Sequence, residues 1–98
     1  MTPIGPFETA SQARTAAHFA VPPPEGSSIL TAEGNRKLLG RALEAAGVEM
    51  GRYDDRIAEW LAGFEDAICA VVAGWVSRAH AAGLAAVRDD GSDKGGEQ

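Results

Sequence analysis

The residues of this 98-residue chain best able to do chemistry are a cluster of acids, one thiol and two imidazoles. Asp55 and Glu59 lie one helical turn apart with Asp54 beside them, so these carboxylates could bind a divalent cation or act as acid and base. A Mg²⁺ or Ca²⁺ site needs further oxygen ligands from a second element, and the sequence identifies none. Acids are also favoured near a helix N-terminus. We therefore expect a solvated helix face here and no metal site.

Cysteine and histidine are too few to build a catalytic or zinc site. Cys69, the single cysteine, lies within an apolar helical run, while His80 is about three turns further along the same predicted helix. The other imidazole, His18, lies in the N-terminal segment. A nucleophilic thiol needs an imidazole or cationic neighbour, and a zinc site needs more ligands than these residues supply. We predict a protein that is not an enzyme, with no cofactor and with Cys69 as a small core residue.

Composition and charge narrow the class of protein. Hydrophobic residues make up 45% of the chain and charged residues 23%, which is typical of a folded globular domain. The formal net charge is −5, and much of the acidic excess lies in the last ten residues. The rest lacks the basic face of a nucleic-acid binder. The most apolar stretch, Ala67–Val76, is half as long as the ~20 residues that span a bilayer, and no secretory signal is recognisable. We expect a cytoplasmic protein.

The chain divides into three parts. Residues 1–28 hold all five prolines, including the run Pro22–Pro24, and predict a flexible arm. Residues 29–88 carry a helical pattern of apolar residues and predict one compact domain. Residues 89–98 are rich in aspartate and glycine and predict an acidic disordered tail.

Within the arm, Glu8–Ala20 could form a short helix because alanine and glutamine favour one. Its apolar positions are mostly alanine, so it has little to bury. The alternative to a flexible arm is a segment that orders on a partner through Phe7 and Phe19.

The middle part predicts three helices. The first spans Ala32–Ala46, with Thr31 as N-cap and Gly47 as a left-handed residue after its end. The second contains the stripe from Tyr53 to Phe64 and ends at Gly63; the third spans about Asp66–Val87 and overhangs the other two from His80 onward. The predicted core is Leu38, Leu39, Leu43, Val48, Ile57, Trp60, Leu61, Phe64, Ile68, Val71, Val72, Trp75 and Val76.

The third predicted helix carries a second side of small residues, which would let another helix approach closely. Two alternatives are open: this side packs against the first predicted helix of the same chain, or it contacts another chain. Trp75 could complete the core with Trp60 or anchor a neighbouring chain. The predicted partner-binding residues are Gly74, Trp75, Ser77, Arg78 and Ala81.

A DNA-binding helix-turn-helix is the alternative function. It would place a turn at Gly74 and begin the recognition helix near Ser77. That helix would offer few polar groups, chiefly Arg78 and His80, whereas a reader of base edges needs several. The near-neutral charge of the middle part, residues 29–88, also counts against it.

Four segments of the middle part resemble small helical proteins of actinobacteria and their phages that have no assigned activity. The segments are L-T-A-E-G from Leu30, A-A-G-V-E from Ala45, Y-D-x-R-I-x-x-W-L-A-G from Tyr53 and C-A-V-V-A-G from Cys69. The resemblance covers about half of the chain and neither end. The resemblance implies an intracellular bacterial setting such as a phage or mobile element, and it transfers no catalytic residue.

Taken together, these observations predict an all-α protein with a compact three-helix domain, a disordered arm and an acidic tail. A core of about sixty residues is near the lower size limit for a self-sufficient fold. We therefore expect a small interaction module that acts as an oligomer or on a larger partner protein, and we expect no membrane and no nucleic acid among its partners. A DNA-binding regulator is the alternative.

Overall fold

Four helices form the protein in the computed structural model, which describes residues 4–93 and the side chains as far as Ala86. They are α1 (Ala10–Ala20), α2 (Ala32–Ala45), α3 (Arg52–Ala62) and α4 (Asp66–Asp93). No strand occurs within the described part of the chain. The prediction of an all-α fold is confirmed, and the number of helices is four instead of three.

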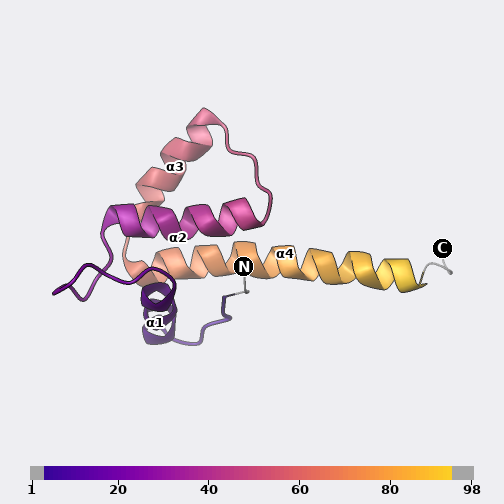
Figure 1. Cartoon of the computed structure of the whole chain (residues 1–98), viewed down its shortest axis with the longest axis horizontal. Helices are drawn as coiled ribbons and strands as arrows, with labels where there is room; N and C mark the ends of the chain where they lie inside the picture. Colours follow the sequence, from indigo (N-terminus) through magenta and orange to yellow (C-terminus); the bar gives the residue numbers. More distant parts are fainter. Residues whose placement is uncertain (1–3, 94–98) are drawn as a thin grey trace.

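The helix α4 is the longest helix and the one on which both α1 and α2 pack. Both α1 and α2 pack against it from different sides, whereas α3 packs on α2 and leans away from α4 (Figure 1). With 28 residues, α4 is about 42 Å long, and its C-terminal half extends past the other three helices (Figure 1). The predicted overhang of the last helix is therefore present.

Local sequence signals set the ends of α2. The Thr31 hydroxyl accepts a hydrogen bond from the Gly34 amide at 3.0 Å and so caps the N-terminus. At the other end Gly47 has φ +75°, a conformation that glycine adopts without steric cost. The Val48 amide then donates to the Leu43 carbonyl at 3.0 Å, as in a Schellman motif. The predicted cap and the predicted left-handed glycine are both confirmed.

The predicted flexible arm contains α1, which is part of the fold. Thr9 caps this helix by accepting a hydrogen bond from the Gln12 amide at 3.1 Å. Ala13 and Ala17 are each 1% exposed and belong to the same core as the alanines of α4. The sequence predicts a flexible segment here because alanine buries little area. Methyl side chains on both helices nevertheless let the two backbones approach closely, so the loss of area per residue is offset by tight packing.

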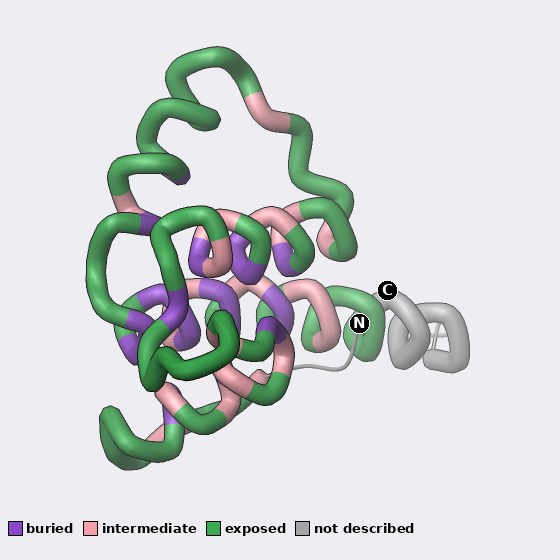
Figure 2. The backbone as a smooth tube through the Cα atoms, turned by 60° about the vertical axis from the view of Figure 1, so that its left-hand side comes forward, coloured by how far each residue is buried: buried purple, intermediate pink, exposed green. Residues whose placement is uncertain are grey.

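The core consists mainly of small side chains. Its α4 members are Ala67, Cys69, Ala70 and Ala73, and Leu38 and Leu39 of α2 are the largest apolar side chains that are fully enclosed. Figure 2 shows the buried positions concentrated where α1, α2 and α4 meet, with most of α3 exposed.

Much of the predicted core is on the surface. Leu38 and Leu39 are buried as predicted, and the partly buried members are Leu43, Leu61, Val71, Val72 and Val76. The prediction is wrong for six residues, which are exposed: Val48, Ile57, Trp60, Phe64, Ile68 and Trp75. The physical reason is the position of α3, which packs on α2 and leaves its own apolar stripe and that of α4 uncovered.

The predicted acidic tail is not confirmed for its first five residues. Residues 89–93 continue α4, so the helix passes the predicted boundary at Arg88. The rest of the predicted tail, residues 94–98, lies outside the described part of the chain.

Candidate functional site

The most conspicuous surface of the protein is an apolar groove along α4. Because α1 and α2 pack against the small residues of α4, its large residues point outward. Ile68 is 42% exposed and Trp75 is 61% exposed, although both lie on the most apolar helix of the chain. We define the apolar groove as two hollows that meet on this side of α4.

The first hollow lies between α2, α3 and α4 and has a volume of about 580 Å³. Its wall on α3 includes Tyr53 and Ile57, and its floor on α4 includes Val72 and Val76. The only charged residues that line it are Glu49 and Asp54; the other lining residues are Leu39, Leu43, Met50, Val48, Ala58, Leu61 and Ala73.

The second hollow lies on the other side of the exposed face of α4 and has a volume of about 390 Å³. The segment before α1 and the start of α1 form its wall through Phe7 and Ala10, and α4 contributes Ile68 and Trp75. Val72 lines both hollows, so they meet on α4.

An aromatic pair extends the apolar surface along α3. The rings of Trp60 and Phe64 lie 4.8 Å apart at 65°, an edge-to-face arrangement. Trp60 is nevertheless 60% exposed, and Tyr53 is 70% exposed. Tyr53, Ile57 and Trp60 follow each other at i, i+4 and i+7, so they lie along one edge of α3. Phe64 lies just past the end of this helix, in the turn before α4.

The predicted partner-binding residues separate into three groups. Trp75 lines the groove, whereas Gly74 and Ser77 are covered by the chain's own N-terminal segment. The Ser77 hydroxyl accepts a hydrogen bond from the Ile4 amide at 2.9 Å. A Cβ at position 74 would lie 2.8 Å from the Ile4 carbonyl oxygen, so this close approach requires glycine.

The remaining two predicted residues are only partly covered. Arg78 donates from Nε to the Gly74 carbonyl at 3.1 Å, and Ala81 lies one turn further along α4 with intermediate exposure. The small-residue side of α4 therefore packs within the chain, against α2 and also against α1 and the N-terminal segment, which neither alternative named. Contact of this helix with another chain stays a prediction. Gly74 lies inside continuous helix, so the turn required by the helix-turn-helix hypothesis is not present there.

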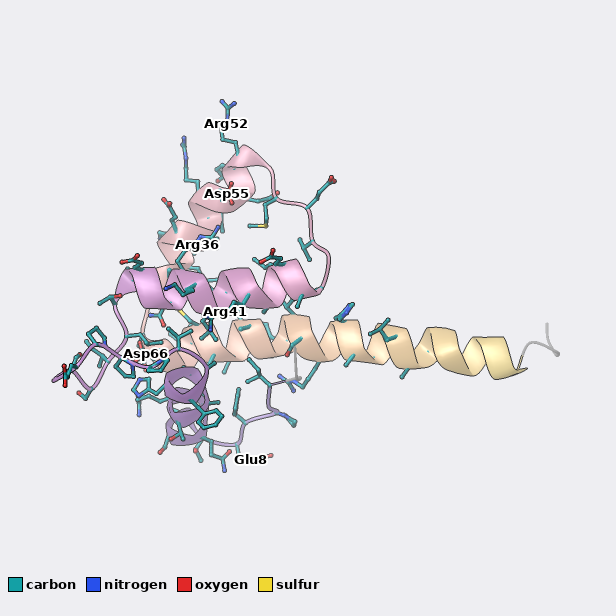
Figure 3. The ribbon with its side chains drawn as sticks, viewed as in Figure 1. Glu8, Arg36, Arg41, Arg52, Asp55 and Asp66 are labelled. Carbon is teal, nitrogen blue, oxygen red and sulfur yellow. The ribbon has the colours of Figure 1, made fainter. Side chains whose placement is uncertain are left out.

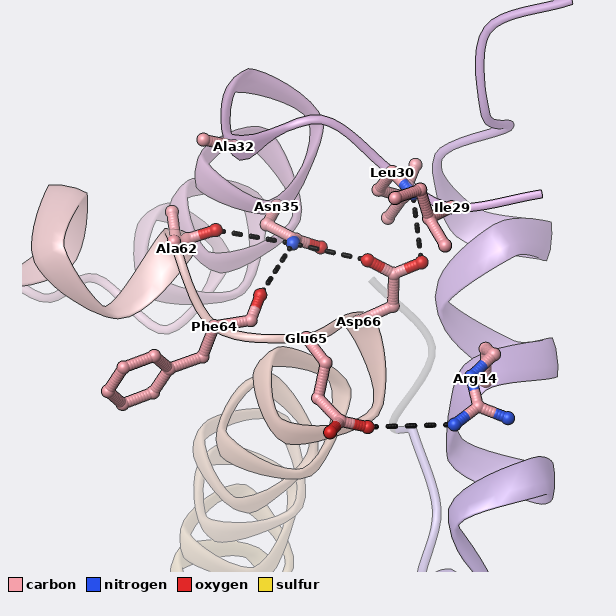
Figure 4. A pocket seen from close by; sticks show the side chains of 10 residues that line it. Arg14, Ile29, Leu30, Ala32, Asn35, Ala62, Phe64, Glu65 and Asp66 are labelled. Carbon is pink, nitrogen blue, oxygen red and sulfur yellow. Dashed lines mark hydrogen bonds and ion pairs between the residues drawn. The ribbon is translucent and has the colours of Figure 1, made fainter. Parts of the chain in front are cut away.

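A second candidate site is a buried polar cluster around Asp66 (Figure 4). Asp66 is 4% exposed and accepts hydrogen bonds from the His18 Nε2 at 2.6 Å and from the Leu30 amide at 2.9 Å. Asn35 Nδ2 donates to the other carboxylate oxygen at 3.3 Å. The carboxylate thus joins α1, the connection before α2, and α2 itself to the start of α4.

Asn35 connects this cluster to the turn between α3 and α4. Its Nδ2 lies 3.2 Å from the carbonyl oxygens of both Ala62 and Phe64, at the turn between α3 and α4. Its Oδ1 is buried, with no hydrogen-bond partner in the described structure. A hollow of about 360 Å³ adjoins the cluster, and Arg14 and Glu65 form a 3.5 Å ion pair beside it (Figure 4).

The environment of Asp66 favours its charged form. Burial raises the pKa of this carboxyl, but the hydrogen bonds from the Leu30 amide, His18 and Asn35 outweigh burial and hold the pKa below the ordinary value of 3.8. The three donors come from α1, from the connection before α2 and from α2, so this carboxylate holds three parts of the chain to the start of α4 and acts as a structural anchor.

Cys69 does not complete a catalytic pair with this cluster. Burial raises the pKa of its thiol to about 11, and the nearby charge of Asp66 acts in the same direction. The thiol donates weakly to the Leu61 carbonyl at 3.4 Å. At neutral pH it is protonated and enclosed, consistent with the expected role as a small core residue.

Asp54 and Asp55, two of the acids considered as a metal site, form other interactions in the structure. Asp54 accepts a hydrogen bond from the Gly51 amide at 2.8 Å and caps its own helix. Asp55 pairs with Arg36 of α2 at 3.1 Å, and Figure 3 shows the two side chains between α2 and α3. Among the side chains that the structure describes, residues 4–86, no group of three or more His, Cys, Asp and Glu is placed to hold a metal ion.

Sequence reasoning missed the cluster around Asp66. His18 fell in the predicted arm, so no contact with α4 was expected from it. Asn35 carried a usable signal, since it precedes Leu38, Leu39 and Ala42 at helical spacing on the buried side of α2.

One helix segment, Asp66–Ala86, is long and apolar enough to cross a bilayer by length and composition alone. About one third of this segment is buried inside the fold. No protein-family model, no curated protein and no solved structure matches this chain.

Proposed function

We propose that this protein is a non-enzymatic interaction module that binds another polypeptide through the apolar groove. The observation that carries the proposal is the inverted distribution of side chains: alanines fill the core, while Trp60 and Trp75 are each about three-fifths exposed.

The extent of this surface supports the proposal. Monomeric proteins rarely expose contiguous apolar patches larger than a few hundred Å². Six large residues belong to the groove or to the adjoining Trp60–Phe64 pair. With side-chain areas of roughly 150–250 Å², their exposed parts amount to on the order of 600 Å². These residues are Tyr53, Ile57, Trp60, Phe64, Ile68 and Trp75.

The composition of the groove favours a polypeptide over a charged ligand. Its floor and walls are mainly aliphatic and aromatic. The first hollow has charge only at Glu49 and Asp54, and the second only at Glu8 and Glu65. Tryptophan and tyrosine are enriched among residues that dominate protein–protein binding energy, because they bury large areas at a modest entropic cost.

Photo-crosslinking from the groove tests the proposal. Benzoylphenylalanine replaces Trp75 in one variant and Lys37, an exposed residue of α2 that lines neither hollow, in a control variant. We expect covalent adducts with a polypeptide, either a second copy or another protein of the native host, from position 75 and not from position 37. Equal yields at the two positions, or no adduct from position 75, would contradict the proposal.

A further inference from the structure

The exposed side of α4 continues beyond the groove onto the overhang. Ile68, Val72 and Trp75 are spaced by four and three residues, and Ala79, Ala82 and Ala86 continue the same spacing. Positions at this spacing share one side of a helix. The three alanines are exposed, and they lie where α4 has passed the other helices (Figure 1). We call these six residues the outer stripe.

The side chains of the outer stripe become smaller toward the C-terminus of α4. The first half of the stripe is large and lies in the groove, and its second half consists only of methyl side chains on the overhang. If a second α4 lies antiparallel, each large residue faces a small one: Ile68 opposite Ala86, Val72 opposite Ala82, and Trp75 opposite Ala79. All three pairs share one register, with a twofold axis near position 77. A parallel pair would instead place the two tryptophans against each other and the alanines against alanines.

The available area fits a dimer. A standard protein–protein interface buries about 800 Å² per partner. The exposed parts of Tyr53, Ile57, Ile68 and Trp75, which line the groove, supply on the order of 400 Å². The alanine half of the outer stripe and the partly exposed Val72 and Val76 add to this, so one face per chain approaches the standard size.

We propose that the occupant of the groove is a second copy of this chain, with the two α4 helices packed antiparallel and the overhang of each seated in the groove of the other. This inference rests on the proposed function and specifies its partner. The contact is isologous, so it closes as a twofold dimer. The antiparallel arrangement also brings the negative C-terminal end of each helix dipole toward the positive N-terminal end of the other. The overhang would thereby gain the packing that it lacks in a single chain.

A charge on the overhang tests the interface without disturbing the core. Ala82 is exposed and belongs to the outer stripe, whereas Ala85 is equally exposed and lies about 100° around the helix from the centre of the stripe. In Ala82→Arg, an unpaired charge would face Val72 of the second copy. We expect the dimer to dissociate at about tenfold or higher protein concentration than the wild type. The matched control, Ala85→Arg, should stay within about twofold of the wild type. Light scattering over a dilution series measures both. A dimer that responds equally to the two changes would overturn the inference.

Disulfide trapping tests the orientation. Chains carrying Ile68→Cys are mixed with chains carrying Ala86→Cys, and the native Cys69 is retained because it is buried. A disulfide needs Cβ atoms about 4 Å apart, so it forms only between residues in direct contact. We expect mixed disulfides between positions 68 and 86. Predominant links from 68 to 68 and from 86 to 86 would overturn the antiparallel register.

The outcomes separate this inference from the proposed function. A chain that remains monomeric at its highest soluble concentration, yet crosslinks from position 75 to a different polypeptide, would overturn the second-copy inference alone. A monomer that gives no crosslink from the groove would overturn both.

Discussion

The two sides of α4 differ in the size of their side chains and in their exposure to solvent, and this difference accounts for the arrangement of the helices. The side toward α1 and α2 carries Ala70, Ala73 and Gly74, and it is closed so tightly that a Cβ at Gly74 would collide with the N-terminal segment. The opposite side carries Ile68 and Trp75 and is open to solvent. Small side chains on this helix mark where the chain packs on itself. Large side chains mark where it has surface left to bury.

Substitution of the buried Asp66 should destabilise the closed side of α4 more than any other change proposed for it. Asp66→Ala removes the acceptor of three hydrogen bonds and leaves the Leu30 amide and Asn35 Nδ2 without this partner. We expect a loss of about 3 kcal/mol in the free energy of unfolding, measured by urea denaturation.

A neighbouring acid provides the control for that experiment. Glu65 forms an exposed ion pair with Arg14, and Glu65→Ala should cost no more than about 1 kcal/mol. Similar losses for the two variants would show that the cluster around Asp66 is not an anchor.

Enlarging a small residue on the closed side should come next in effect. Ala70 is fully buried where α4 meets its neighbours, so Ala70→Leu forces overpacking and should cost about 1–3 kcal/mol. Thermal unfolding followed by circular dichroism measures it. The same substitution at Ala82, on the open side, should leave the midpoint of the monomer nearly unchanged; a large drop there would contradict the distinction between the sides.

Acid should weaken the closed side. The pKa of Asp66 in the folded state lies below its ordinary value of 3.8, so in acid the unfolded chain binds a proton before the folded chain does. The contribution of Asp66 is therefore complete above the ordinary value and is lost as the pH falls toward the lowered one. Unfolding free energies measured between neutral pH and pH values below 3.8 should fall more steeply in the wild type than in Asp66→Asn. Equal slopes would mean that other carboxylates cause the acid sensitivity.

The smallest effect on the single chain is expected from the open side. Trp75 is 61% exposed, so Trp75→Ala should change the free energy of unfolding of the monomer by only about 0.5 kcal/mol. The same change should weaken binding through the groove, which light scattering measures separately. A strongly destabilised monomer would show that Trp75 belongs to the core after all.

Several elements were predictable because their causes are local. The caps of α2 at Thr31 and Gly47 depend on backbone geometry within a few residues, and both are present. The start of α4 near Asp66 and its overhang also follow from the chain itself. The candidate site was only partly predictable: Trp75 lies in the groove, whereas Gly74 and Ser77 contact Ile4, a residue at least seventy positions away.

The sequence by itself determined that the protein is helical, where α2 and α4 begin, and which side of each helix is apolar. Periodicity carries this information because it reflects the geometry of a single helix. Only the tertiary structure decided that α1 belongs to the fold, that α3 packs on α2, and that the large stripe of α4 is open while the small one is closed. Hydrophobic burial has no direction of its own, so an apolar stripe does not specify which element covers it. Which element covers a stripe depends on how closely two helix backbones can approach. In this protein the alanines of α1 and α4 allow the closest packing, so the small-residue side of α4 is the covered one.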